Sequence, residues 1–156
     1  QRSIGSKSTL KELEKWVNTL IETNDWGVGM THGLTYGYDA FRNPQRLWDH
    51  LDQVKARENE IWVGTFREVA SYIKEREETK LEVVNKKNTL LITPELKLDQ
   101  ELFVEPLTMV ITGKEIKKVT VKQGKRRLPV QITDDKVLFD FDPYGGMIKV
   151  TLKIQK

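Results

Sequence analysis

The sequence predicts an α/β segment over residues 1–79, followed by an all-β domain over residues 80–156. In the first part, apolar stripes at helical spacing alternate with short apolar runs, a pattern typical of parallel strands joined by helices. In the second part, the apolar period changes from 3.6 to 2 residues and turn signals recur about every ten residues. The charge balance shifts at the same place: residues 1–79 carry 11 Lys and Arg against 13 Asp and Glu, whereas residues 80–156 carry 15 against 10.

Three helices are expected in the first part, and each has a recognisable start. Two begin with a capping box, in which a Thr and a Glu three residues later satisfy each other's main-chain N–H groups. The other begins with an Asn as N-cap and a Pro at the first helical position. The three starts lie at Thr9-Glu12, Asn43-Pro44 and Thr65-Glu68.

Two apolar runs between these helices, Trp26–Thr31 and Ile61–Thr65, are expected to be parallel strands joined by right-handed crossovers. Two parallel strands with three helices do not close a sheet, and parallel sheets are normally covered on both faces. We therefore expect a partner, such as a second copy of the chain, at the open sheet edges beside Val28 and Val63.

Beyond Thr79, seven short strands with turn signals between them predict an antiparallel β-sandwich. The last strand alternates apolar and polar residues, so that one face is buried and the other is solvated. The seven strands are expected near Lys80–Val84, Thr89–Thr93, Leu107–Thr112, Lys117–Lys122, Leu128–Thr133, Val137–Asp142 and Met147–Ile154.

The composition, 38% apolar and 31% charged, is that of a globular protein. No apolar run approaches the roughly 20 residues that a membrane-spanning helix needs. The absence of cysteine excludes disulfides, thiol nucleophiles and thiolate metal sites. Nucleic-acid binding is not expected, because the basic residues between 117 and 127 bracket a turn without interleaved aromatic residues. The chain begins with neither Met nor the apolar segment of a signal peptide, and we expect a piece of a longer product.

His32 is the best functional candidate in the sequence. It follows the expected strand Trp26–Thr31 at its carboxyl end, where the active sites of α/β sheets gather. The alternative is that its imidazole only satisfies main-chain groups at the end of a strand. Tyr36, Tyr38 and Asp39 lie in the loop after His32, where they would either form a substrate-binding rim or simply cover the core.

The runs W-G-V-G-M-T-H-G (residues 26–33) and I-W-V-G-T-F-R-E-V-A-S-Y-I-K (residues 61–74) resemble the C-terminal portion of polysaccharide deacetylases of carbohydrate esterase family 4. The resemblance covers residues 1–79, and the β-sandwich is similar to the accessory domain of some secreted bacterial members. It implies part of a (β/α) barrel that removes acetyl groups from N- or O-acetylated polysaccharides. It also implies an extracellular, envelope or periplasmic location.

In that family, a divalent metal, usually zinc, is bound by one Asp and two His, and polarises the acetyl carbonyl and a bound water. A second Asp is the general base and a late-barrel His is the general acid. The resemblance implies that His32 is this acid, that Met30 lines the acetyl pocket in place of a Leu, and that the loop after His32 binds substrate. The family's paired Asp and H-x-x-x-H motifs do not occur in this chain, which has only His32 and His50. The resemblance therefore implies a metal in the parent enzyme, no cofactor in this chain, and no activity of the chain alone.

A second hypothesis stays open beside the hydrolase. In it, the chain is a non-catalytic module whose sandwich binds a glycan or a protein partner, and residues 1–79 are a scaffold. That hypothesis predicts glycan binding by residues 80–156 without any contribution from His32.

Overall fold

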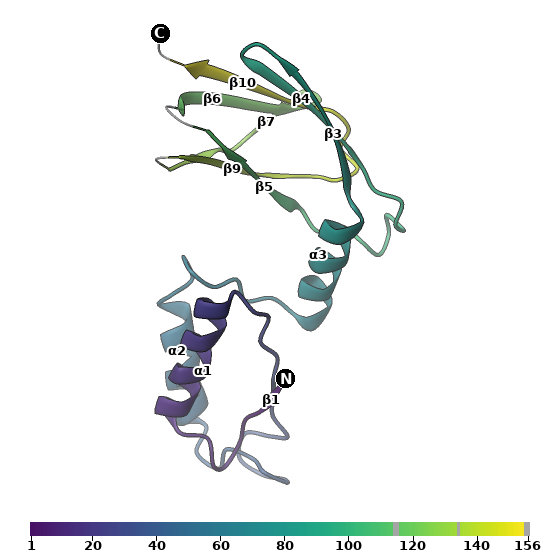
Figure 1. Cartoon of the computed structure of the whole chain (residues 1–156). Helices are drawn as coiled ribbons and strands as arrows, with labels where there is room; N and C mark the ends of the chain where they lie inside the picture. The colour runs from purple at the N-terminus through teal and green to yellow at the C-terminus, as the bar shows by residue number, and fades with distance from the viewer. Residues whose placement is uncertain (114–115, 134, 155–156) are drawn as a thin grey trace. The chain divides into compact units, whose positions relative to one another are not determined.

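The computed structural model describes residues 1–113, 116–133 and 135–154 (Figure 1). These residues form a mixed α/β structure with three helices, one two-stranded parallel sheet and two antiparallel sheets. No barrel closes among them. The chain divides into two compact units, Gln1–Gly64 and Thr65–Lys156, each of which is described by itself below.

The division between the units falls before the third helix, α3 (Phe66–Glu78), rather than after it at the expected boundary, Thr79. The helix belongs with the second unit because it packs against β5 (Leu107–Thr112) and leads directly into β3 (Lys80–Lys86). The expected capping box at Thr65 and Glu68 is confirmed: each residue's side chain accepts the other's main-chain N–H.

The first unit is built on two helices that pack against each other, α1 (Leu10–Thr23) and α2 (Gln45–Lys55). The expected capping box at the start of α1 is confirmed. Helix α2 begins one residue later than expected, yet the Asn43 side chain still caps it by accepting the Gln45 N–H at 3.1 Å. The core of this unit contains Ile4, Leu13 and Phe41, with Leu47 packed against them.

The parallel sheet of the first unit consists of β1 (Arg2–Ser3) and β2 (Gly29–Met30). The expected parallel strand in Trp26–Thr31 is therefore confirmed over Gly29–Met30, with β1 as its partner, whereas the expectation that Ile61–Thr65 is the second parallel strand is wrong. The N-terminal residues satisfy the main-chain groups of the first run instead: the Arg2 N–H donates to the Val28 carbonyl at 2.8 Å, and the Ile4 N–H donates to the Met30 carbonyl at 2.9 Å. Residues 61–64 belong to no sheet of the described chain.

Two glycines explain how the chain around β2 fits beside α1. A Cβ at Gly27 would lie 2.2 Å from the Leu20 side chain and 3.0 Å from the Trp16 indole, and Gly29 also faces that indole. Because glycine has no side chain, the main chain approaches the helix closely enough to cover the indole. The W-G-V-G-M pattern therefore reflects helix packing as well as strand formation.

The second unit contains two antiparallel sheets, as expected for the part of the chain beyond Thr79 (Figure 1). The five-stranded sheet has the order β3-β4-β10-β6-β7, and the three-stranded sheet has the order β5-β9-β8. The remaining strands are β4 (Thr89–Glu95), β6 (Ile116–Gln123), β7 (Arg126–Leu128), β8 (Gln131–Ile132), β9 (Lys136–Phe141) and β10 (Ile148–Ile154).

The expected strand Leu128–Thr133 is split between the two sheets, since β7 pairs with β6 whereas β8 pairs with β9. Pro129 lies at the break, where it can donate no ladder hydrogen bond. The other six expected strands are present with end shifts of at most two residues.

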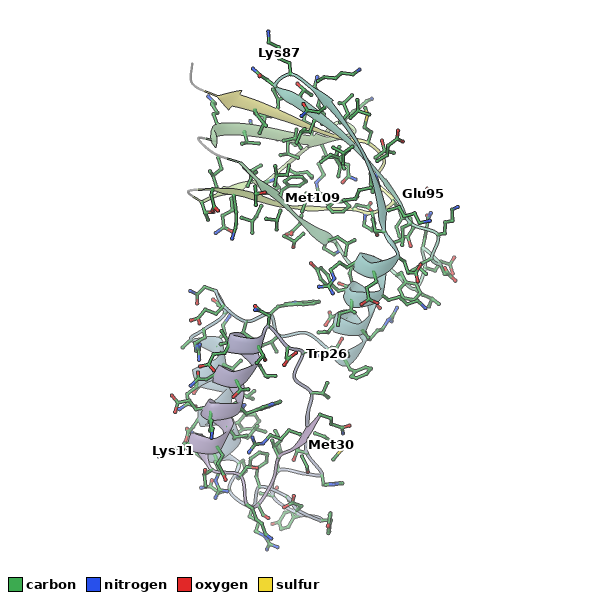
Figure 2. The ribbon with its side chains drawn as sticks, viewed as in Figure 1. Lys11, Trp26, Met30, Lys87, Glu95 and Met109 are labelled. Atoms are coloured by element: carbon green, nitrogen blue, oxygen red, sulfur yellow. The ribbon has the colours of Figure 1, made fainter. Side chains whose placement is uncertain are left out.

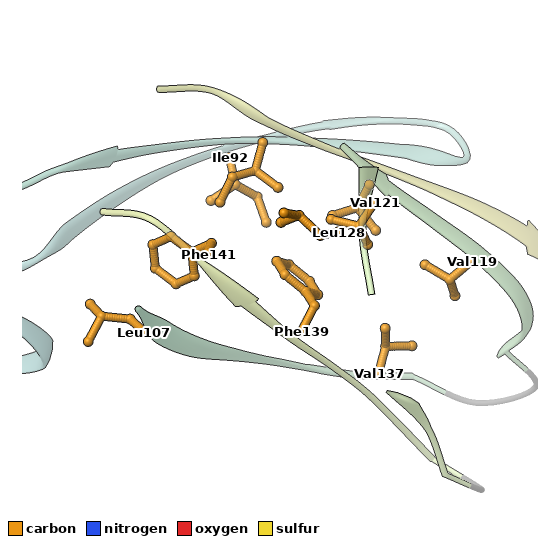
Figure 3. Close-up of a cluster of buried hydrophobic side chains, with 10 residues drawn as sticks. Ile92, Leu107, Val119, Val121, Leu128, Val137, Phe139 and Phe141 are labelled. Atoms are coloured by element: carbon orange, nitrogen blue, oxygen red, sulfur yellow. The ribbon is translucent and has the colours of Figure 1, made fainter. Parts of the chain in front are cut away.

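The core of the second unit lies between its two sheets (Figure 3). Val137, Phe139 and Phe141 point inward from alternate positions of β9, and meet residues such as Val121 and Leu128 from the five-stranded sheet. The residues between them in sequence face outward, as the period of a strand requires. This alternation fixes which side chains form the outer surface of each sheet.

Glu75 of α3 is fully buried in the second unit. Its Oε1 atom accepts the Glu105 main-chain N–H at 3.1 Å, and its Oε2 atom has no hydrogen-bond partner among the described residues. Burial raises the pKa of this carboxyl, and the nearby charges of Glu105 and Asp142 act in the same direction. Folding therefore favours the protonated form of Glu75.

Candidate functional site

His32 follows the carboxyl end of β2, two residues after Met30. Met30, the last residue of β2, is labelled in Figure 2. Its side chain is exposed, so the imidazole is accessible to a ligand in this unit. Its neighbour in space is Tyr38, whose ring meets the imidazole edge to face, with 5.3 Å between centroids and 79° between planes. The structure therefore brings together two of the residues that the sequence singles out.

The loop after His32 folds back on itself and is anchored by a buried aromatic residue. Phe41 is 1% exposed, and its N–H donates to the Gly33 carbonyl at 3.2 Å, which closes the loop. A Cβ at Gly33 would lie 2.5 Å from the Tyr36 carbonyl oxygen, so only glycine permits this close return of the chain. Gly37 has a φ of 107°, which glycine adopts without strain. The shape of the loop therefore depends on a main-chain hydrogen bond within it and on the conformations of its two glycines.

Tyr36 and Tyr38 project from this loop with 89% and 82% of their surfaces exposed. They do not cover the core of the first unit, because Ala40 and Phe41 do so instead. Exposed aromatic rings have the shape and apolar face that stack on sugar rings. Of the two interpretations left open by the sequence, the exposure of both rings argues against the core cover, and the substrate-binding rim stays a prediction.

Asp39 fastens the loop to the N-terminal segment. Its Oδ1 atom accepts the Ser6 hydroxyl at 2.6 Å and the Ser6 main-chain N–H at 3.1 Å. These hydrogen bonds to the charged form lower the pKa of the Asp39 carboxyl, and the nearby His32 and Lys7 act in the same direction. Asp39 therefore ties the loop that carries Tyr38 to the segment before α1.

Met30, the expected wall of an acetyl pocket, is the last residue of β2 and is partly exposed. Its sulfur lies 3.6 Å from the Gln1 side-chain amide nitrogen. Met30 thus presents an apolar, polarisable side chain two residues before His32, and its role as the wall of an acetyl pocket stays a prediction.

Two residues that support this site are not among those that the sequence singles out. Ser6 binds Asp39, and the Arg46 guanidinium of α2 donates to the main-chain carbonyls of Ser6 and Ser8, at 3.0 Å each. Together they hold the segment before α1 against both the loop and α2. The only sequence signal for them is the small, polar run Gly5-Ser6 immediately before the capping box.

The second histidine is not part of this site. His50 lies in α2 with 5% of its surface exposed, and burial lowers its pKa, which favours the neutral ring. Within the described residues, no three His, Asp or Glu side chains gather in a group that could hold a metal ion. The residues around His32 thus do not fit the metal centre that the family resemblance implies.

Comparisons with protein-family models, with curated proteins and with solved structures found no match to this chain. No helix in the described residues is long and apolar enough to cross a lipid bilayer. The molecule is thus defined by its own geometry: a mixed α/β protein with an exposed histidine and two exposed tyrosines at the end of a parallel strand.

Proposed function

We propose that this chain is the C-terminal part of a metal-dependent polysaccharide deacetylase, which hydrolyses N- or O-acetyl groups on a glycan. The observation that carries the proposal is the position of His32, which is exposed, follows the carboxyl end of a parallel strand and lies beside Tyr38. Chemistry in α/β enzymes concentrates at this end of the strands, because loops there vary while the strands hold their position.

In the proposed reaction, His32 is the general acid. Imidazole is the side chain best suited to donate a proton near neutral pH, and loss of the acetyl group leaves an amine or alkoxide that needs one. The loop anchored by Phe41 and Asp39 limits the motion of the chain that follows His32. Tyr36 and Tyr38 bind the sugar by stacking, and Met30 contacts the acetyl methyl group.

The metal of this proposed enzyme has no place among the described residues, so we assign its ligands to other parts of the parent protein. The chain by itself is then inactive. The parent is exported, because acetylated polysaccharides lie outside the cytoplasm.

The proposal also accounts for an apolar surface in the first unit. Val63 is 69% exposed and Leu51 is 44% exposed, and both line a groove between α2 and residues 58–63. In the parent enzyme, neighbouring barrel elements cover this groove. In the isolated chain, we expect a second copy to do so, and light scattering that shows only monomer at high concentration contradicts this expectation.

The experiment that tests the proposed function compares two proteins made from the same reading frame, this chain and the complete product that contains it. We expect zinc-dependent release of acetate from acetylated xylan or chitooligosaccharide by the complete product only. A complete product that lacks paired Asp and H-x-x-x-H motifs, or that releases no acetate when loaded with zinc, overturns the proposal. Tyr36→Ala is expected to raise KM, with Tyr36→Phe as the control that keeps the ring.

The alternative is a non-catalytic glycan-binding or protein-binding module, and the separate core of the second unit favours it. In that case the chain binds a glycan with equal affinity whether or not His32 and both loop tyrosines are replaced. Calorimetric titration of the chain and the triple variant with the same oligosaccharides separates the two proposals.

A further inference from the structure

The outer face of the five-stranded sheet carries a row of cations on adjacent strands. Lys149 of β10 lies directly opposite Lys122 of β6, and Lys122 lies directly opposite Arg127 of β7. Their neighbours in sequence, including Val121, Val150 and Leu128, are buried in the core, so alternation places the three cations on the opposite, outer face. All three are exposed. We refer to Lys149, Lys122 and Arg127 as the basic row.

The basic row is electrostatically unfavourable in the isolated molecule. Adjacent strands lie about 4.7–4.9 Å apart, and like charges directly opposite each other destabilise a sheet. Lys118 adds a fourth exposed cation to the same face, because it lies four residues before Lys122 on β6. An anion bound across this face reduces the repulsion between the cations and therefore stabilises the sheet.

The acidic residues in the described part of the five-stranded sheet, Glu82 on β3 and Glu95 on β4, lie outside the three strands that carry the basic row. Strands β6, β7 and β10 contain no Asp or Glu, and the ion pairs found in the described residues lie elsewhere. On β4 the acidic residue is Glu95, which binds Lys97 at 3.0 Å. Glu95 lies at the open end of the β3–β4 hairpin, opposite the turn that contains Lys87 (Figure 2).

A row of threonines runs beside the basic row on the same face. Thr89, Thr151 and Thr120 are cross-strand neighbours on β4, β10 and β6. Their hydroxyl groups donate and accept hydrogen bonds, as sugar hydroxyls do. A polymer that lies across β10 and β6 thus meets both the row of cations and the row of hydroxyls.

We propose that this face binds an anionic polysaccharide that carries its charge as carboxylates, such as a polyuronate. Such a chain presents one carboxylate per sugar, and can lay successive carboxylates over successive strands of the basic row. Its hydroxyls then reach the threonine row. The choice of a glycan among polyanions rests on the proposed function, whereas the anionic character of the ligand rests on the basic row alone.

Nucleic acid fits the same face less well. The outward positions of β4, β6, β7 and β10 in the described residues hold no aromatic side chain on which a base could stack. An open sheet face also presents no helix or ribbon to enter a duplex groove. The open arrangement of cations and hydroxyls matches an extended sugar chain better.

The test uses the 156-residue chain and three probes: polygalacturonate, neutral dextran and a DNA duplex. We expect polygalacturonate to bind, with an affinity that falls as salt rises, and dextran not to bind. The variant Lys122→Gln/Arg127→Gln/Lys149→Gln is expected to bind polygalacturonate about tenfold more weakly. The control variant Lys11→Gln/Lys15→Gln/Lys136→Gln removes the same net charge from exposed positions on other elements, α1 and β9, and is expected to bind like the unaltered chain.

Three outcomes overturn the inference: no binding of polygalacturonate, equal loss in both triple variants, or tighter binding of the DNA duplex than of polygalacturonate. Since all substituted side chains are exposed, both variants are expected to fold, which circular dichroism checks. The assay does not depend on acetate release. Failure of this inference is therefore distinct from failure of the proposed deacetylase.

Discussion

The Asp39 carboxylate and Ser6 are joined by two hydrogen bonds across 33 residues of sequence, one from the Ser6 hydroxyl at 2.6 Å and one from its main-chain N–H at 3.1 Å. This pair ties the loop that carries Tyr36 and Tyr38 to the segment between β1 and α1. The loop beside His32 is thus positioned by tertiary hydrogen bonds rather than by its own sequence alone.

Replacement of Ser6 by Ala removes one of these hydrogen bonds and is expected to raise the pKa of Asp39 toward its ordinary value. Because this pKa is lowered by folding, the pair contributes stability above the unfolded pKa, and that stability is lost as pH falls through the folded value. Carboxyl chemical shifts followed by NMR during an acid titration measure the change. Ser3→Ala is the control, and an Asp39 pKa that is the same in both variants contradicts the assignment.

Gly5→Ala is expected to displace the same loop. An added Cβ would lie 2.1 Å from the Asp39 carbonyl oxygen, a main-chain atom that cannot move aside without moving the loop. At Gly29 the nearest atom to an added Cβ is 3.4 Å away, on the Ile4 side chain, so Gly29→Ala is the matched control. NMR shifts of the His32 and Tyr38 rings should change in the first variant and stay close to their original values in the second. Unchanged rings in Gly5→Ala would show that the loop is placed by other contacts.

Phe41→Ala is expected to lower the stability of the first unit by about 3–5 kcal/mol, because it removes a buried aromatic side chain and leaves a cavity. All four tryptophans lie in residues 1–64, so tryptophan fluorescence during urea denaturation reports on this unit. Tyr36→Ala, at an 89% exposed position of the same loop, should change stability by less than about 0.5 kcal/mol. Equal losses in the two variants would refute the anchoring role of Phe41.

Glu75→Gln tests the buried carboxyl of the second unit. The raised pKa of Glu75 means that its contribution to stability is full below the ordinary value of 4.5 and is lost as pH rises through the folded value. Glutamine keeps an oxygen for the Glu105 N–H but does not ionise. The variant is therefore expected to gain stability relative to the unaltered chain as pH rises above 4.5. Thermal denaturation followed by circular dichroism measures this gain in stability. The control is Glu77→Gln, at an exposed position of the same helix. If the stabilities of the two variants depend on pH in the same way, the buried Glu75 carboxyl does not have the expected effect.

Features set by neighbouring residues could be predicted from the sequence. Both capping boxes depend on a Thr and a Glu three residues apart, and both are present at Thr9 and Thr65. The strands of the second unit follow from period-2 alternation, and β5 has the expected bounds. Local physical chemistry decides such features before any tertiary contact forms.

Pairing between distant segments could not be predicted in the same way. Strand β1 is two residues long, and Arg2–Ser3 has no periodic pattern that marks a strand. Residues 61–64 have the apolar composition of a strand, yet they enter no sheet of the described chain. A strand exists only where another strand completes its hydrogen bonds, and composition does not reveal that partner.

For the candidate site, the sequence indicates the exposed residues His32, Tyr36 and Tyr38, but not the residues whose hydrogen bonds hold their loop in place. The polar end of an apolar run pointed to His32, and the aromatic loop pointed to Tyr36 and Tyr38. The sequence does not indicate Ser6 or Arg46, because their roles depend on hydrogen bonds to segments more than 30 residues away. The roles of these side chains in catalysis and substrate binding stay predictions.

The measurement that tests the central claim most directly is acetate release by the complete, zinc-loaded product of this reading frame, with His32 intact and with His32→Ala. Since His32 is exposed, the substitution should leave folding unchanged, which circular dichroism and tryptophan fluorescence verify. The account predicts a loss of about 10²- to 10⁴-fold in kcat, the usual contribution of a general acid. Full activity in the folded His32→Ala protein would contradict it.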